Sequence, residues 1–191
     1  MLKKILCLIP AAGLLLTGGC SLFSSAASPA PAFYDLASQE AAPAGRVQAE
    51  FRTLADVTGN GLGIVTRQKD GRVVSDDLNR FSAPPVQLIR RRLTELFPPK
   101  IPGKGVRIGG TLCRFEIDAG RSCALLVMDY HLAFRGAHKA LRHRIETKLK
   151  GNSGRDAAAS LEECVILSAR RLAAEVEGFK KECDKNKEEK K

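Results

Sequence analysis

Six cysteines and three histidines are the residues of this chain whose side chains could carry nucleophilic, redox or metal chemistry. No CxxC pair occurs, which argues against a thioredoxin-type redox site and against a zinc ribbon. No Asp or Glu lies near the histidines at a spacing that suits a metal site, and we interpret them as exposed residues of basic strands: His131, His138 and His143. No GxSxG serine motif is present. The sequence therefore predicts no catalytic residue and no metal site.

Residues 1–19 have the pattern of a secretory signal. Lys3 and Lys4 form a positive region, and residues 5–16 are mostly apolar. A membrane-spanning helix needs roughly 20 apolar residues, so this stretch is too short to cross a bilayer. Residues 1–19 are therefore predicted to be a signal peptide that is removed from the mature chain.

The signal ends in LLLTGGC, which resembles the lipobox of bacterial lipoproteins. The resemblance implies that the sulfur of Cys20 carries a diacylglycerol and that the new amino terminus is acylated after cleavage; no other cofactor is expected. The leucine usual three residues before the cysteine lies one place early, at Leu16, and Thr17 takes its position. Ser21 follows in place of an aspartate, which indicates the periplasmic face of the outer membrane. The alternative is a plain secretory signal with a chance cysteine.

The mature chain divides into a tether, one domain and a charged tail. Residues 20–32 are mostly small residues and prolines that cannot bury a core, and they are predicted to be a lipidated, flexible tether. Residues 33–180 suffice for one domain, and residues 181–191 mix both charges as a solvated tail. The net charge of +10 falls to +8 when the two signal lysines are removed. Because a lipidated periplasmic protein meets no nucleic acid, this charge favours anionic head groups or an acidic partner surface.

Four cysteines remain in the mature domain and tail, in a compartment that permits disulfides: Cys113, Cys123, Cys164 and Cys183. A bridge between Cys113 and Cys123 requires a hairpin centred on Asp118, because only then do the two residues face each other. If residues 119–120 form a two-residue loop instead, Cys113 lies opposite Leu126 and no direct bridge forms. The sequence leaves both registers open.

Hydrophobic periodicity predicts the order strands, helix, strands, helix. Alternating or continuous apolar runs indicate strands, with a bulge near Cys113, at residues 33–36, 46–57, 64–67, 105–118, 122–135 and 141–149. A turn is expected over residues 136–139. The predicted fold is α+β: a single domain with a largely antiparallel sheet and two helices packed on one face.

The two helices are predicted from apolar residues spaced by threes and fours. The first begins at Pro84 and Pro85, which suit a first turn, and ends before Pro98. Its arginine run, residues 90–92, is interpreted as a charged outer face, and an anion clamp is the alternative. The second helix follows the breaker and cap GNSGRDAA and buries a stripe that consists of Leu161, Val165, Ser168, Leu172, Val176 and Phe179.

The order of these segments resembles the ABC-type transport auxiliary lipoproteins, the group that includes PqiC. That family shows a YxL near the start, an I-x-R strand, an arginine–tryptophan pair before an amphipathic helix, and L-x-x-x-F-E before a hydrophobic strand. The corresponding positions in this chain are Tyr34 with Leu36, Ile64 to Arg67, Arg80 with Phe81, and Leu112 with Phe115 and Glu116. The resemblance covers nearly all of residues 33–180. Phe81 stands where the family has tryptophan, in a chain that contains none.

The resemblance implies a non-enzymatic outer-membrane component of an intermembrane lipid transport system. Its partner would be an MCE-domain protein anchored in the inner membrane, and copies of the lipoprotein could form a ring on the MCE tunnel. Arg80, Phe81, Pro84 and Pro85 are the predicted partner surface, and a helix start with core packing is the alternative reading of these four residues. A different class of function is a structural or binding lipoprotein of the envelope, associated with peptidoglycan or an outer-membrane barrel, without a transport role.

Overall fold

The computed structural model describes residues 29–37, 40–46, 48–97 and 105–188. The chain divides into two compact units, Met1–Ala30 and Pro31–Lys191, and the fold is that of the second unit. The predicted signal peptide, the lipidated Cys20 and most of the predicted tether lie outside the described residues.

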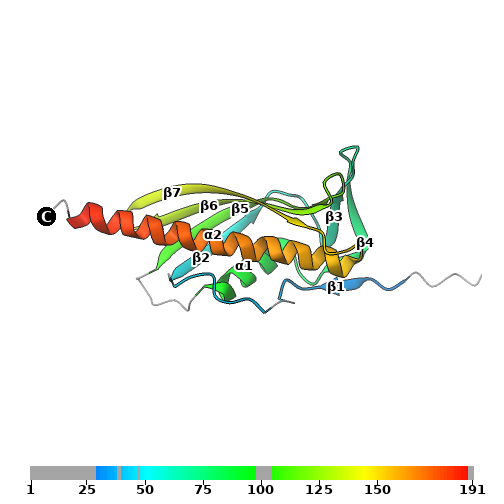
Figure 1. Ribbon diagram of the computed structural model, residues 1–191, viewed down its shortest axis with the longest axis horizontal. Helices are drawn as coiled ribbons and strands as arrows, with labels where there is room; N and C mark the ends of the chain where they lie inside the picture. The colour runs from blue at the N-terminus through cyan, green and yellow to red at the C-terminus, as the bar shows by residue number, and fades with distance from the viewer. Residues whose placement is uncertain (1–28, 38–39, 47, 98–104, 189–191) are drawn as a thin grey trace, which may run out of the picture. The chain divides into compact units, whose positions relative to one another are not determined.

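The second unit contains one mixed sheet of seven strands and two helices, which confirms the α+β class. Both helices lie against the same face of the sheet, and no helix of the described residues lies on the opposite face (Figure 1). We call these the inner and the outer face. The elements are β1 Ala32–Tyr34, β2 Ala49–Asp56, β3 Gly63–Arg67, β4 Val73–Phe81, α1 Pro85–Leu96, β5 Val106–Asp118, β6 Cys123–Phe134, β7 Ala137–Lys148 and α2 Gly154–Glu188.

The sheet has the strand order β1-β4-β3-β5-β6-β7, and β2 also pairs with β5. β2 and β3 share one edge of β5: β2 lies opposite Val106–Leu112, and β3 lies opposite Ile117 and Asp118. The longest ladders, β5–β6 and β6–β7, are antiparallel, as the sequence predicts. The β1–β4, β2–β5 and β3–β5 pairs are parallel, and periodicity alone gave no indication of them.

One strand was missing from the sequence prediction, and one turn was predicted at the wrong residues. β4 was not predicted, because its polar run of Ser, Asp and Asn is unfavourable in strands and becomes extended only through pairing with β3 and β1. The turn between β6 and β7 is shorter than predicted: Phe134 pairs with Ala137, so the loop is Arg135 and Gly136. Both loop residues have positive φ, 50° and 82°, which is the conformation of a type I′ hairpin turn.

The β5–β6 hairpin adopts neither of the two predicted registers. Asp118 pairs with Cys123, so the loop spans residues 119–122. The predicted bulge at Cys113 is confirmed, because the register shifts between Leu112 and Arg114. Cys113 therefore lies in the bulge, five positions along β5 from the partner of Cys123, and both thiols are free. The possible disulfide between Cys113 and Cys123 is not formed.

The core lies between the inner face of the sheet and the helices. Every second residue of β6 faces this core and is almost fully buried: Ala124, Leu126, Met128, Tyr130 and Leu132. The predicted stripe of α2 is confirmed, since all six of its residues are buried. The predicted cap is confirmed as well, because Ser153 and Asp156 bond each other's backbone N–H groups at the start of α2.

The first eight residues of the predicted charged tail, 181–188, are helical, because α2 continues to Glu188. Two contacts with the β6–β7 hairpin hold this last part of the helix. Arg135 forms an ion pair with Asp184, and the Lys180 ammonium lies 6.0 Å from the centre of the Phe134 ring. Cys183 also packs against the core. Residues 181–188 therefore belong to α2, and their start is attached to the folded domain.

Candidate functional site

Residues of three separate sequence motifs contact one another through β5, on which Phe115 and Glu116 are neighbours. Arg67, at the end of β3, donates hydrogen bonds from Nε and Nη2 to the two carboxylate oxygens of Glu116 on β5, at 2.8 and 3.2 Å. Phe81, at the end of β4, contacts Phe115 with ring centroids 5.6 Å apart. Neighbouring residues of β5 thus contact the ends of two other strands, one on each face of the sheet.

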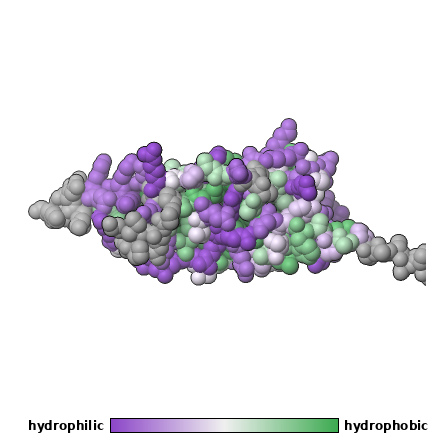
Figure 2. Space-filling model, turned by 90° about the horizontal axis from the view of Figure 1, so that it is seen from below, coloured by the Kyte–Doolittle hydropathy of each residue, from purple (hydrophilic) through white to green (hydrophobic). Residues whose placement is uncertain are grey.

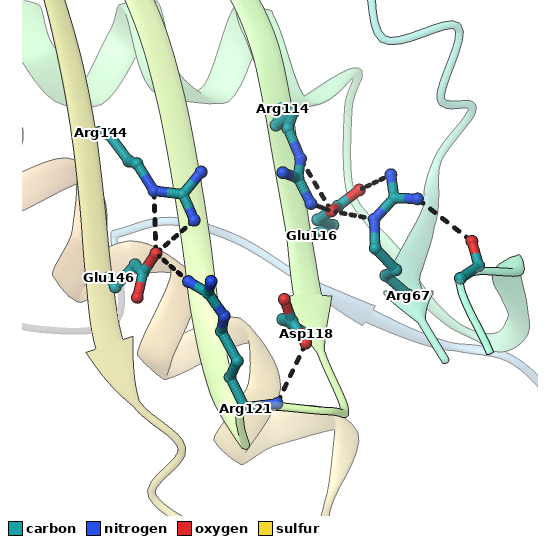
Figure 3. Close-up of polar contacts among 8 residues, drawn as sticks. Arg67, Arg114, Glu116, Asp118, Arg121, Arg144 and Glu146 are labelled. Atoms are coloured by element: carbon teal, nitrogen blue, oxygen red, sulfur yellow. Dashed lines mark hydrogen bonds and ion pairs between the residues drawn. The ribbon is translucent and has the colours of Figure 1, made fainter. Parts of the chain in front are cut away.

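The polar part of this cluster is on the outer face (Figure 3). Arg114 donates from Nε to Glu116 at 2.9 Å, so two guanidinium groups share one carboxylate that is only 4% exposed. Burial opposes ionisation of Glu116, but the hydrogen bonds and charges of Arg67 and Arg114 outweigh it and lower the pKa of this carboxyl. The same contact raises the pKa of Arg67. Glu116 therefore stays ionised, and the cluster is suited to joining strands rather than to proton transfer.

A second ionic group lies beside it on the same face. Glu146 on β7 accepts hydrogen bonds from Arg121 at 3.0 Å and from Arg144 at 2.9 Å (Figure 3). In the β5–β6–β7 register, Leu125 lies between Glu116 and Glu146, and Val127 lies between Arg114 and Arg144. Leu125 and Val127 are 0% and 6% exposed, although no helix covers them. The aliphatic parts of these charged side chains therefore cover a small apolar patch on the outer face, which Leu125 and Val127 form.

The apolar part of the motif cluster belongs to the core. Phe81 is 1% exposed and Leu36 is 1% exposed, so both are packing residues. Tyr34 on β1 donates a hydrogen bond from its hydroxyl to the side-chain oxygen of Asn79 at 3.0 Å. This bond and the parallel pairing of β1 with β4 fix the first residues of the domain to its core.

The predicted partner surface divides between the core and the solvent. Phe81 and Pro85 are buried, so they cannot contribute to a docking face. Pro84, the residue before α1, is exposed, and Arg80 is partly exposed and paired with Asp77 at 3.2 Å. The alternative reading, helix start and core packing, describes Phe81 and Pro85 and leaves Arg80 and Pro84 for contacts with other molecules.

The three consecutive arginines of α1 have three different environments. Arg92 is buried and pairs with the fully buried Glu162 of α2 at 3.0 Å. Arg91 pairs with Asp35 on the surface. Arg90 is exposed and lines an open groove of about 800 Å³ between α1 and β2, whose other lining residues include Leu54 and Val86. Neither a uniform outer face nor a three-arginine clamp describes this run.

Among the residues that the structure describes, the histidines and cysteines do not form a reactive cluster. No group of three or more His, Cys, Asp or Glu residues that could hold a metal occurs among the described residues. Burial raises the pKa of Cys164 to about 11, and it also raises the pKa of Cys113 and of Cys123, so these thiols are protonated at neutral pH. His143 was predicted to be exposed, but it is 1% exposed and lies under α2. Its position between Leu141 and Ile145 in the alternation of β7 was the signal for burial.

The comparisons with known proteins concern the fold alone. No family model matches the chain, and no curated protein matches it significantly. One similar solved structure is an uncharacterized protein, with a TM-score of 0.64 and 14% identity over 77% of this chain and 99% of the other. Another is protein XCC0632 from Xanthomonas campestris, of family DUF330, with a TM-score of 0.56 and 14% identity over 76% of this chain and 88% of the other. At this identity the likeness shows a shared architecture.

The described part of the chain contains no helix that is both long enough and apolar enough to cross a membrane.

Proposed function

We propose that this protein is an outer-membrane lipoprotein of an MCE/ABC-type intermembrane lipid transport system, held by lipid on Cys20. The observation that carries the proposal is the convergence of the family motifs. Arg67 with Glu116, and Phe81 with Phe115, come from segments far apart in the sequence and form direct contacts. Chance matches to weak motifs would have no reason to meet in space, so the contacts support the resemblance as a whole.

The mechanism in this proposal is mechanical. Two or three acyl chains make membrane attachment effectively permanent, whereas one chain holds a protein only marginally. Residues 20–32 set the reach of the domain, and the domain docks on the end of the MCE tunnel. The groove beside α1 is a suitable docking surface, because Arg90 offers a positive charge next to the apolar walls of Leu54 and Val86. An acidic, partly apolar segment of the partner would complement it.

The test is affinity purification of the tagged full chain from gently solubilised outer membranes, followed by mass spectrometry. We expect an MCE-domain protein to co-purify, and we expect an acyl mass on the Cys20 peptide that is absent from a Cys20→Ala variant. Arg90→Glu should reduce recovery of the MCE protein, whereas the control Arg142→Glu, on the outer face of β7, should not. Recovery of only barrel or cell-wall proteins would contradict the transport proposal and favour a binding lipoprotein of the envelope.

A further inference from the structure

Three large apolar side chains are exposed at one corner of the sheet, around Arg80. Phe33 on β1 is 59% exposed, Leu78 on β4 is 46% exposed, and Leu62, directly before β3, is 36% exposed. In the register, Arg80 pairs with Phe33 on one side and with Gly63 on the other, and the Phe81 N–H donates to the Leu62 carbonyl at 2.7 Å. Phe33 and Leu78 therefore lie near Arg80, and the backbone of Leu62 lies beside Phe81 at the same end of β4. We call Phe33, Leu62 and Leu78 the apolar corner.

A bulge in the backbone of β4 exposes Leu78. The β3–β4 register jumps between Asp76 and Arg80, which leaves a bulge. The carboxylate of Asp76 accepts hydrogen bonds from the N–H groups of Leu78 at 2.8 Å and Asn79 at 3.0 Å, and so holds the bulge. Gly63 is required opposite it, because a Cβ atom there would lie 2.1 Å from the Ser75 hydroxyl.

Two carboxylates and one guanidinium lie at the apolar corner: Asp76 is held by amide donors of Leu78 and Asn79, and Asp77 is paired with Arg80. The charges of Arg80 and Asp77, at 3.2 Å, balance each other. The space-filling view from below shows hydrophobic surface over β1, at the start of the compact unit (Figure 2). The exposed Arg80–Asp77 ion pair contributes little to stability. A group of three exposed large apolar side chains is unusual for a surface that faces only water.

The corner lies at the point where the tether joins the domain. Residues 21–31 separate Cys20 from β1. Fully extended they could span roughly 40 Å, and as a flexible coil about 18 Å on average. A lipid on Cys20 would hold the corner within this distance of the bilayer, at a high effective concentration, so even a weak apolar contact would be populated.

We propose that the apolar corner is a membrane-contacting surface, which inserts Phe33, Leu62 and Leu78 into the interface of the bilayer that the anchor occupies. This inference rests on the proposed function, because it requires lipid on Cys20. Aromatic and aliphatic side chains are suited to such shallow insertion.

The contact would also orient the domain. The Asn79 side chain lies directly against Gly154, at the start of α2. Asp184, thirty residues later on the same helix (184 minus 154), pairs with Arg135 in the β6–β7 turn. At about 1.5 Å per residue these two ends are roughly 45 Å apart. With the apolar corner on the membrane, the β6–β7 turn and the end of α2 would face away from the anchor.

The absence of tryptophan from the chain allows a direct test. The lipidated full chain is reconstituted in vesicles of phosphatidylethanolamine and phosphatidylglycerol, with or without brominated acyl chains. Phe33→Trp places a reporter in the corner, and His138→Trp, on exposed β7 next to the turn, is the control. We expect blue-shifted emission and strong quenching by brominated lipid for Phe33→Trp only. Adding Leu78→Glu to Phe33→Trp should decrease this quenching.

Three results would overturn the proposal. Equal quenching of Phe33→Trp and His138→Trp would contradict a preferred orientation of the domain on the membrane. Blue-shifted emission of Phe33→Trp without quenching would mean that a protein, such as a second copy, covers the corner. Missing acyl mass on Cys20 would contradict the proposed anchoring itself, and this failure is distinguished from the first two because in those the protein is acylated and bound to the vesicles.

Discussion

The two faces of the sheet hold arginine–glutamate pairs in different ways. On the inner face, Arg92 and Glu162 link α1 to α2 with side chains that are 9% and 0% exposed. On the outer face, Arg67 and Glu116 link β3 to β5 with side chains that are 34% and 5% exposed. Both pairs join elements that are distant in the sequence, but only the outer arginines retain access to water.

Because of this difference in exposure, the two pairs should respond differently when one partner is removed. A buried charge that loses its partner cannot be solvated, whereas a guanidinium that is one-third exposed can turn to water. Removal of either partner of the inner pair should therefore be strongly destabilising. The outer cluster should lose less stability when one of its contacts is removed, and we call its members replaceable contacts. The outer arginines and glutamates also cover Leu125 and Val127, so part of their contribution is packing rather than charge.

The largest effect is expected from Glu162→Ala. Arg92 would lose a fully buried partner and keep its ion pair with Glu95, whose side chain is 41% exposed. Loss of one member of a buried pair costs about 3 to 5 kcal/mol in the free energy of unfolding. The neighbouring Glu163→Ala is the control, because Glu163 pairs with Lys150 in an exposed position. Urea denaturation followed by circular dichroism measures both, and equal losses would contradict the distinction between buried and exposed pairs.

The inner face should also give the protein a specific dependence on pH. Burial, and then the charge of Arg171, lower the pKa of His143 to about 4, although Glu175 acts in the opposite direction. His143 is therefore neutral in the fold, with Nδ1 3.0 Å from the Ser168 hydroxyl. Below pH 6.5 the unfolded chain takes up a proton that the folded chain does not, so stability falls as pH decreases from 6.5 to about 4.

At about 1.4 kcal/mol per pH unit, this histidine accounts for a loss of roughly 3 kcal/mol over that window. Carboxylates titrate in the same range, so the quantity to measure is the difference between the wild-type chain and His143→Gln. The unfolding free energy of the variant should depend less steeply on pH between 6.5 and 4. Parallel pH curves for the two proteins would show that folding does not lower the pKa of His143.

An intermediate effect is expected from Glu116→Gln on the outer face. The amide keeps the shape of the side chain but removes the charge that Arg67 and Arg114 share, and charge-assisted hydrogen bonds contribute about 1.5 to 3 kcal/mol. Partial exposure of both arginines should place the loss in unfolding free energy at the low end of that range. Glu146→Gln is the matched control, with a side chain 36% exposed, and should cost less. A larger loss in unfolding free energy for Glu146→Gln would mean that Glu146, and not Glu116, is the more important carboxylate of the outer face.

The sequence predicted the elements that have a regular apolar period. It failed where pairing between segments distant in the sequence determines the structure. The stripe of α2 and the β5–β7 strands follow from spacing alone. β4 does not, because only pairing with β3 and β1 makes its polar run extended. Arg92 and Glu162 look like ordinary helix-surface charges until α1 and α2 are packed together. The motif residues could be named in advance, but their contacts depend on the parallel β3–β5 register, which has no local signal.

The smallest effect is expected from Arg121→Ala. Its guanidinium is 61% exposed, and Glu146 keeps a second partner in Arg144. The contact of Arg121 with Asp118 uses the backbone N–H, at 3.1 Å, and so survives the substitution. Exposed ion pairs contribute about 0.2 to 1 kcal/mol, and this one should be at the lower limit.

Urea midpoints of the wild-type chain and Arg121→Ala, measured at low and high salt, test this prediction. Near-equal midpoints at both salt concentrations would fit a surface of replaceable contacts, because salt weakens an exposed pair that contributes little already. A salt-sensitive loss as large as that of Glu116→Gln would mean that the two carboxylates and their four arginines act as one cooperative network that links β3, β5 and β7. In that case the outer face would resemble the inner face in its intolerance of a missing partner, and exposure would not be the property that separates them.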